Sequence, residues 1–331
     1  MTVVSAIWHG GDLDTAKRLF PDAPDPWLDL STGINPIPYP LPDIPASAWQ
    51  RLPGRAEEAG LLAAARRAYG VPADAGLIAA PGTQILIELL PALGRAGDRI
   101  AVVGPTYGEH VRTWRKAGHE VAEVQSLAEA GDARVLVLVN PNNPDGGIVA
   151  PGELDDVARR FAARGGLIIV DEAFADFEPG TSIVPTLPPS TLVLRSFGKT
   201  YGLAGLRLGF AVARGDLTAR LAERLGPWAV PGPALVVGTT ALADRGWRDA
   251  AARARAGDAE RLDRLLAKIG RVIGGTSLFR LVETEQAADL FDRLGRHGIY
   301  VRRFQDQPLR LRFGLPAGEA AWSRLAAALA G

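Results

Sequence analysis

The chain has 331 residues, with 37 Lys and Arg balanced by 37 Asp and Glu, four His and no Cys. This length allows about two domains of ordinary size, and the balanced charge without a basic tract argues against nucleic acid as a partner. The absence of cysteine excludes disulfides, thiolate metal sites and a cysteine nucleophile, and we expect no metal. No signal-like N-terminus and no apolar run of about 18 residues occurs, so we expect no membrane partner and a cytoplasmic location.

The first 234 residues predict an arm followed by a large domain. Residues 1–45 are rich in proline and turn signals, which indicates an extended N-terminal arm that packs with a small domain. In 46–234, short apolar runs alternate with amphipathic ones such as Glu153–Ala163, which is typical of an α/β fold with a mostly parallel, doubly wound sheet. The seven expected strands are residues 77–80, 99–103, 120–124, 135–139, 167–170, 191–195 and 208–213.

Residues 235–331 predict a second, smaller α+β domain. A long helix rich in Ala and Arg is expected from Leu235 to about Ile269. Two or three short strands near 278–282, 300–303 and 309–313 and a closing helix from Glu319 complete this domain.

Polar residues follow five of the expected strands of the large domain. Ligands bind at this edge of a doubly wound sheet. Each segment alone has an ordinary explanation, such as a helix cap after Gly82, a half-buried Tyr107, turn-forming asparagines or a buried ion pair at Asp171. The five segments are "PGTQ", "PTYGEH", "NPNNPDGG", "VDEAFADF" and "SFGKTYGLAGLRLG".

Together, the five segments supply what pyridoxal phosphate needs from a protein. Asp171 would keep the ring nitrogen protonated, Tyr107 would stack on the ring, and Lys199 would bind the aldehyde as a Schiff base. An amide from the asparagine segment would meet the phenolic oxygen. The phosphate would be bound at the start of a helix and around the lysine, by Gly82, Thr83, Gln84, Ser196 and Arg207.

On these segments the whole chain resembles the fold type I pyridoxal phosphate enzymes, in their class I/II aminotransferase branch. The resemblance implies that Lys199 holds the cofactor and then moves protons, that Asp171 pairs with the ring nitrogen and that Asn143 meets the phenolic oxygen. It also implies a homodimer with active sites at the subunit interface. A binding or regulatory protein on a degenerate scaffold of this kind is the other class considered, and the intact set of site residues argues against it.

Three positions depart from the histidinol-phosphate aminotransferases, which the chain otherwise resembles throughout. Phe174 stands where "DEAY" has tyrosine, Asp145 stands where "NPTG" has threonine, and Leu52 stands where "RYPD" has a tyrosine that reaches the neighbouring subunit. The segments "WHGGDL", "WLDLSTGINPIPYP" and "LRFGLP" instead resemble the threonine-phosphate decarboxylases of the cobalamin pathway. This resemblance implies decarboxylation of O-phospho-L-threonine to (R)-1-amino-2-propanol phosphate, with a histidinol-phosphate or related aminotransferase as the alternative.

The substrate is therefore expected to be a phosphorylated amino acid, held at both ends. Residues that anchor the two ends decide which bond at the α carbon aligns for cleavage. One anchor for the carboxylate is expected in "LRLRFGLP", where Arg310 and Arg312 lie two apart on a strand and so share a face. The resemblance favours Arg312, which fits the family's pattern of an arginine, a few apolar residues and then the last helix, and Arg310 is the second choice. The resemblance implies that the arm residues His9, Gly33 and Asn35 bind the substrate, with His9 and Asn35 at its phosphate.

Overall fold

A computed structural model describes residues 9–330 of the chain. By their contacts, the residues divide into two compact units, which are described one at a time. The large unit comprises residues 38–143 and 147–251, and the small unit comprises the N-terminal segment up to 37, residues 144–146 and the segment from 252. The domain boundaries predicted at 45 and 234 stay predictions.

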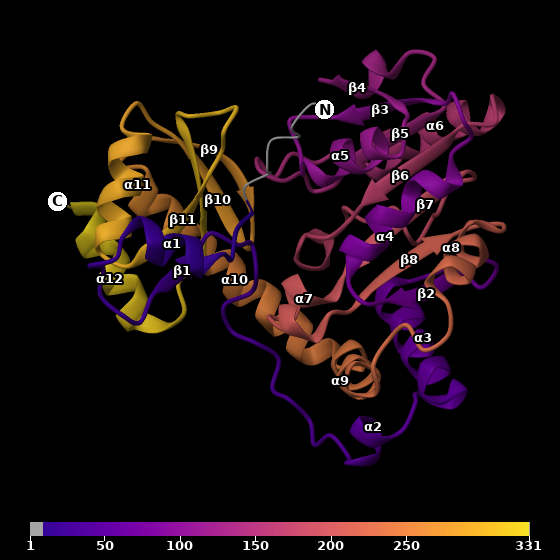
Figure 1. The fold of residues 1–331 in the computed structure, drawn as a ribbon, viewed down its shortest axis with the longest axis horizontal. Helices are drawn as coiled ribbons and strands as arrows, with labels where there is room; N and C mark the ends of the chain where they lie inside the picture. The colour runs from indigo at the N-terminus through magenta and orange to yellow at the C-terminus, as the bar shows by residue number, and fades with distance from the viewer. Residues whose placement is uncertain (1–8, 331) are drawn as a thin grey trace. The chain divides into compact units, whose positions relative to one another are not determined.

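The large unit is built on a seven-stranded sheet, which confirms the predicted fold class (Figure 1). All neighbouring strands pair in parallel except β8, which is antiparallel to β7 and to β2. In spatial order the strands are β2 (Gly76–Ala80), β8 (Gly209–Ala213), β7 (Thr191–Ser196), β6 (Leu167–Asp171), β5 (Val135–Val139), β3 (Arg99–Val103) and β4 (Glu120–Val124).

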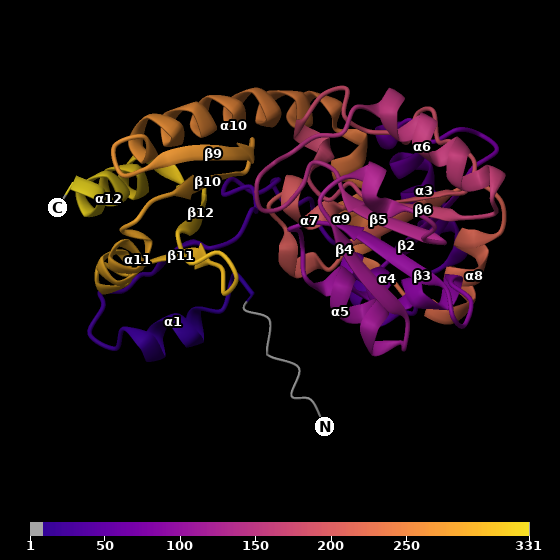
Figure 2. The same cartoon turned by 90° about the horizontal axis from the view of Figure 1, so that it is seen from above.

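Helices cover both faces of this sheet (Figures 1 and 2). Strands β5 and β6 are buried along their whole length, which explains why their sequences are nearly continuous runs of Val, Leu and Ile. One face packs against α3 (Arg55–Tyr69), α6 (Pro151–Ala163) and α9 (Gly232–Ala243). The other face packs against α4 (Thr83–Leu89), α5 (Glu109–Lys116) and α8 (Leu217–Leu225).

Short helical turns connect these elements. Helix α7 (Phe197–Thr200) follows β7 directly, and α2 (Ser47–Gln50) precedes α3. The 3-10 turns are η1 (Leu90–Leu93), η2 (Leu127–Ala130), η3 (Ala175–Phe177) and η4 (Ala204–Leu206).

The small unit contains a five-stranded sheet in the order β1 (Leu28–Leu30), β11 (Ile299–Arg303), β12 (Arg310–Gly314), β10 (Phe279–Glu283) and β9 (Arg271–Thr276). The pair β1 and β11 is parallel, and the other pairs are antiparallel. Its core is formed with α1 (Leu13–Leu19), α11 (Ala287–Arg296), α12 (Gly318–Ala330) and the second part of α10 (Arg245–Leu266).

Two sequence-based expectations about these helices and strands were wrong. The long helix from Leu235 is two helices, α9 and α10, because Asp244 leaves the helical conformation and its carboxylate accepts a hydrogen bond from the Trp247 amide at 2.9 Å. Aspartate is favoured at such a cap. The N-terminal segment is not only extended, since it contains α1 and β1. Among residues 9–330, no helix is both long enough and apolar enough to cross a membrane.

Candidate active site

Asp171 ends β6 and is 3% exposed, so its carboxylate is removed from water. Its Oδ2 lies 3.0 Å from Nε2 of His110, and its Oδ1 accepts a hydrogen bond from the Ala173 amide at 3.1 Å. His110 is fully buried in α5, and its Nδ1 has no hydrogen-bond partner among the described residues. When Nε2 donates to Asp171, this hydrogen bond fixes the orientation of the buried carboxylate.

Lys199 lies on α7, one turn beyond the end of β7. Its Nζ is 5.0 Å from the centre of the Phe174 ring, which is 3% exposed. An ammonium over an aromatic face is weakly stabilised by the ring. The phenylalanine at the tyrosine position of "DEAY" therefore contacts the lysine. It has no hydroxyl that could donate a hydrogen bond to a ligand oxygen.

Gly82 and Arg207 form a cradle between the ends of β2 and β8. A Cβ atom on Gly82, whose φ is 87°, would collide with the guanidinium of Arg207. A Cβ atom on Gly209 would lie 2.7 Å from the amide nitrogen of Thr83. Glycine at both positions leaves space in which an exposed arginine and backbone N–H groups approach closely, and such an arrangement suits a phosphate. Ser196, the last residue of β7, is 8% exposed.

Tyr107 is held by a chain of side chains from α4 and α5. Its hydroxyl donates to Oε1 of Gln84 at 3.0 Å, and Nε2 of Gln84 donates to Oε2 of Glu109 at 3.1 Å. Glu109 is 3% exposed and is paired with Arg112. The Tyr107 ring meets His110 edge to face, with 6.1 Å between the ring centres. The ring is therefore fixed from two sides.

The asparagine segment is shaped by two of its own amides. Asn140 is buried and exchanges hydrogen bonds with the backbone of Val149, at 2.8 and 3.1 Å. Asn142 accepts from the hydroxyl of Thr106 at 2.6 Å and donates to a backbone carbonyl at 3.0 Å. These two side chains have structural partners, and Asn143 follows them at half-buried exposure.

The small unit contains a second group of sequence-predicted residues around Arg312. Arg312 is 6% exposed on β12, its Nη2 donates to the Ser31 carbonyl at 2.8 Å, and its guanidinium lies over the Phe279 ring at 5.0 Å. Arg302 is its partner across the β11–β12 ladder. Burial, together with Arg302, lowers the pKa of the Arg312 guanidinium to about 9.

Arg310 and the arm residues have different surroundings. Arg310 donates to Glu283 at 3.0 Å and to Gln307 at 2.9 Å, so its charge is matched by a carboxylate. Asn35 is 2% exposed and accepts a hydrogen bond from Arg255 at 3.2 Å, and Gly33 is buried nearby in sequence.

The segment after His9 is tied to the same strand connection that Arg312 reaches. The Gly11 amide donates to Ser31 Oγ at 2.7 Å, and a Cβ atom on Gly10 would collide with the Ser31 carbonyl oxygen. His9 itself is exposed. The arm therefore approaches the carbonyl that accepts from Arg312.

Sequence reasoning missed two residues of these groups. His110 was part of the quoted segment "PTYGEH", and the useful signal would have been a histidine in the first turn of a helix that follows a strand end. Arg302 could be found only from the strand register, which places it opposite Arg312. Within residues 9–330, no cluster of three or more His, Asp or Glu side chains is placed to hold a metal ion.

Comparisons with known proteins identify the family and the fold of the chain. The family model "Aminotransferase class I and II" matches residues 58–328. A threonine-phosphate decarboxylase of Pseudomonas aeruginosa is 45% identical over 98% of this chain and 97% of its own length, and one of a Sinorhizobium species is 45% identical over 98% of both chains. A solved histidinol-phosphate aminotransferase of Sinorhizobium meliloti, in complex with pyridoxal-5'-phosphate, shares the fold with a TM-score of 0.80 at 22% identity, covering 98% of this chain and 94% of that one.

Proposed function

The chain belongs to the class I and II aminotransferase family, and we propose that it decarboxylates O-phospho-L-threonine to (R)-1-amino-2-propanol phosphate with pyridoxal phosphate as cofactor. The observation that carries this proposal is the 45% identity to threonine-phosphate decarboxylases over 98% of the chain. The product is the aminopropanol linker of the cobalamin nucleotide loop.

The residues of the large unit fit the cofactor. The Gly82–Arg207 cradle has the space and the charge for a phosphate, and the buried Asp171 suits a cationic ring nitrogen. When bound, pyridoxal phosphate supplies an electron sink for the bond that breaks at the substrate's α carbon. The residues that would hold it are Gly82, Thr83, Gln84, Tyr107, Asn143, Asp171, Ser196, Lys199 and Arg207.

Lys199 has two roles in this proposal. Its amine would hold the cofactor covalently, and after the loss of carbon dioxide the same amine would deliver a proton to the α carbon of the substrate. Its place on α7 puts the amine nitrogen 5.0 Å from the centre of the Phe174 ring. Asp171, held in place by His110, would pair with the ring nitrogen of the cofactor.

The substrate's anionic ends would be bound by residues of the small unit. Arg312 is favoured over Arg310 for the carboxylate, because Arg310 already pairs with Glu283, whereas burial and Arg302 disfavour the charge of Arg312. An anion beside Arg312 would compensate that buried charge. His9 and Asn35 are proposed for the phosphate end, and Gly33 is a further proposed substrate-binding residue.

An assay of products tests the function. Pure protein reconstituted with pyridoxal phosphate is incubated with O-phospho-L-threonine, and carbon dioxide and 1-amino-2-propanol phosphate are measured. Release of both without a keto acid supports the proposal, whereas strict dependence on 2-oxoglutarate would identify an aminotransferase. Borohydride should fix the cofactor to the wild-type protein but not to Lys199→Ala, and the exposed Lys268→Ala serves as the matched control.

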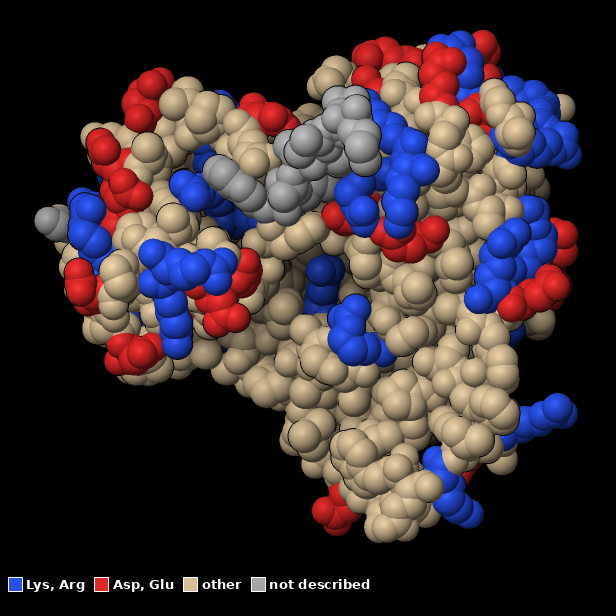
Figure 3. Space-filling model, in the orientation of Figure 1, with Lys and Arg blue, Asp and Glu red and all other residues tan. Residues whose placement is uncertain are grey.

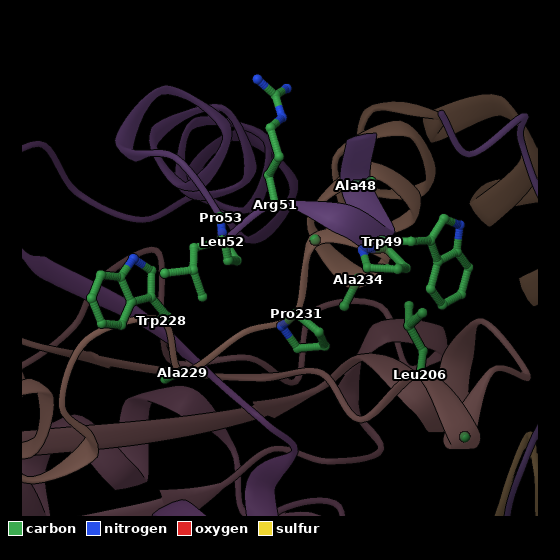
Figure 4. Close-up of a pocket in the computed structure, with 13 residues that line it drawn as sticks. Ala48, Trp49, Arg51, Leu52, Pro53, Leu206, Trp228, Ala229, Pro231 and Ala234 are labelled. Carbon is green, nitrogen blue, oxygen red and sulfur yellow. The ribbon is translucent and has the colours of Figure 1, made fainter. Parts of the chain in front are cut away.

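We also propose that the protein is a homodimer. Trp49, Leu52 and Trp228 are 67%, 68% and 59% exposed and line one hollow of about 500 Å³ on the large unit. Figure 4 shows the two indole rings at opposite ends of this hollow, with Arg51 pointing away from it. Figure 3 shows few charged side chains over α2 and α9, which contribute to its lining.

An exposed apolar patch of this kind is typical of an interface. Leu52 also occupies the position at which related enzymes reach the neighbouring subunit. Light scattering of the wild type and of Leu52→Asp tests this proposal, since the variant should shift toward the monomer mass. A wild-type protein that is monomeric at assay concentration would contradict it.

A cytoplasmic location is proposed on the cysteine-free composition.

A further inference from the structure

Three buried charged side chains form a connected cluster at the ends of β6 and β7. Arg195, the second-last residue of β7, donates from Nη1 to Glu172 and from Nη2 to Asp176. Arg195 and Glu172 are 3% and 1% exposed, and the side chain of Asp176 is 4% exposed. The cluster has two carboxylates for one guanidinium, all out of contact with bulk water.

The cluster is fixed by further partners. Glu172 also accepts from Ser182 Oγ at 2.6 Å and from the Ile183 amide at 2.7 Å, and the guanidinium of Arg195 lies 4.6 Å from the centre of the Tyr69 ring. Buried ion pairs of this kind stabilise a fold little better than well-packed apolar side chains would, because desolvation offsets the attraction. A contribution to stability therefore explains this cluster poorly. The positions of the residues that it connects explain it better.

The cluster connects the neighbours of two site residues. Glu172 follows Asp171 in the chain, and Thr200 follows Lys199. Thr200 is 1% exposed, and its hydroxyl donates to Oδ2 of Asp176 at 3.0 Å. An unbroken path of hydrogen bonds and ion pairs therefore runs from the residue after Asp171, through Arg195, to the residue after Lys199.

The path lies on the opposite face of the sheet from the site. Successive strand residues point to opposite faces. Asp171 contacts His110 of α5 on one face, and Arg195 contacts Tyr69 of α3, which packs on the other face. None of the cluster side chains needs to touch a ligand in order to hold the backbone that carries Asp171 and Lys199.

We propose that Arg195, Asp176 and Thr200 are positioning residues that fix Lys199 relative to Asp171, an inference that rests on the function proposed above. Helix α7 has four residues, too few to be stable without outside contacts. Thr200 at its end supplies such a contact. A displacement of a reacting group by about 1 Å can lower a rate by about 100-fold.

The test compares Thr200→Val, which keeps the shape and removes the hydroxyl, with Thr200→Ser, which restores a hydroxyl. Thr113→Val is the matched control, because Thr113 is 2% exposed and its hydroxyl has no hydrogen-bond partner among the described residues. The holoenzymes are compared by thermal unfolding, by kcat and KM for O-phospho-L-threonine, and by the pH midpoint of the cofactor's visible absorbance. This absorbance reports the surroundings of the Lys199 amine independently of turnover.

Thr200→Val should lower kcat by about 10-fold with KM changed by less than about twofold, and should shift the pH midpoint of the absorbance. Thr200→Ser should recover most of both, and Thr113→Val should match the wild type in both. If folded Thr200→Val and Thr113→Val have the same kcat and the same midpoint, the proposal is overturned. If Thr200→Val does not fold, Asp176→Asn takes its place under the same criteria.

The borohydride experiment on Lys199→Ala separates this inference from the proposed function. If that variant still fixes the cofactor, the proposed role of Lys199 fails. If the wild type fixes the cofactor through Lys199 but Thr200→Val behaves as the control does, only the positioning role fails.

Discussion

The large and small units hold buried charge in opposite ways. At the end of β6, Asp171 is matched by a donor, Nε2 of His110 at 3.0 Å. On β12, Arg312 is buried with another arginine, Arg302, opposite it in the ladder, and its pKa is lowered to about 9. The large unit therefore fixes its buried carboxylate with its own residues, whereas the small unit presents a buried cation that an anionic ligand would stabilise.

Among the changes that test this difference between the units, neutralising Asp171 should have the largest effect on activity. In Asp171→Asn the shape is kept but the charge beside the ring nitrogen is lost, so kcat should fall by at least about 100-fold. Carbon dioxide release by the reconstituted variant measures this loss. The exposed Asp156→Asn is the control. Wild-type turnover in Asp171→Asn would mean that the charge at the end of β6 has a purely structural role.

The sequence predicted the strands of the large unit well because they are buried on both faces. Runs such as "VLVLV" and "LIIVD" have one explanation, and the polar residues that follow them mark the edge where ligands bind. His110 was missed because a single histidine near a helix start has several roles. Only the fold shows that α5 packs on the face to which Asp171 points.

Removing the charge of Arg312 should have the next largest effect. Arg312→Gln removes charge-assisted hydrogen bonds to a substrate carboxylate, which are worth about 1.5–3 kcal/mol, so KM should rise by about 10- to 100-fold. Arg310→Gln should change KM little, because Arg310 is held by Glu283 and Gln307. Steady-state kinetics with O-phospho-L-threonine compares the two variants. A larger effect in Arg310→Gln would reverse their roles.

Spacing alone could not distinguish these two arginines, because both lie on one strand two residues apart, and only the family resemblance favoured Arg312. The choice depends on their neighbours in the sheet, which the strand register sets: Arg310 lies opposite Glu283 and Arg312 opposite Leu281 on β10, while Arg302 faces Arg312 on β11. Similarly, "RVIGGT" was not among the expected strands, yet it forms the edge strand β9, which pairs with β10.

The lowered pKa of Arg312 predicts a pH dependence of KM that originates in the small unit and not in the large unit. An anion beside the guanidinium favours its protonated form, so substrate binding takes up a proton above about pH 9. KM should therefore be flat below that pH and rise by up to about tenfold per pH unit above it. Stability changes in the other direction: the unfolded chain keeps this proton to a higher pH than the folded chain does, so the group by itself favours the fold increasingly as pH rises from about 9.

The pH profile is measured as KM of the wild type and of Arg312→Gln from about pH 7 to about pH 10. The variant should lack the rise that depends on Arg312. If KM rises in parallel in both proteins, the titrating group is not Arg312. The small unit would then not differ from the large unit by a buried cation that an anionic ligand stabilises.

The smallest effect is expected from Tyr107→Phe, which tests how far the geometry of the large unit depends on single hydrogen bonds. The substitution removes the 3.0 Å bond from the hydroxyl to Gln84 but leaves the ring and its edge contact with His110. A net hydrogen bond contributes about 0.5–1.5 kcal/mol, so the dissociation constant of pyridoxal phosphate should rise by about two- to tenfold. Absorbance titration of the apoprotein measures it.

Tyr107→Leu, which removes the ring as well, separates stacking from hydrogen bonding. If Tyr107 acts through its ring, the leucine variant should lose clearly more cofactor affinity than the phenylalanine variant, because aromatic stacking contributes beyond the buried area. Equal losses in the two variants would mean that the hydroxyl and its path through Gln84 to Glu109 carry the contribution. In that case the large unit would hold its ligand through the same kind of buried polar network that fixes Arg195, and not through an aromatic lid.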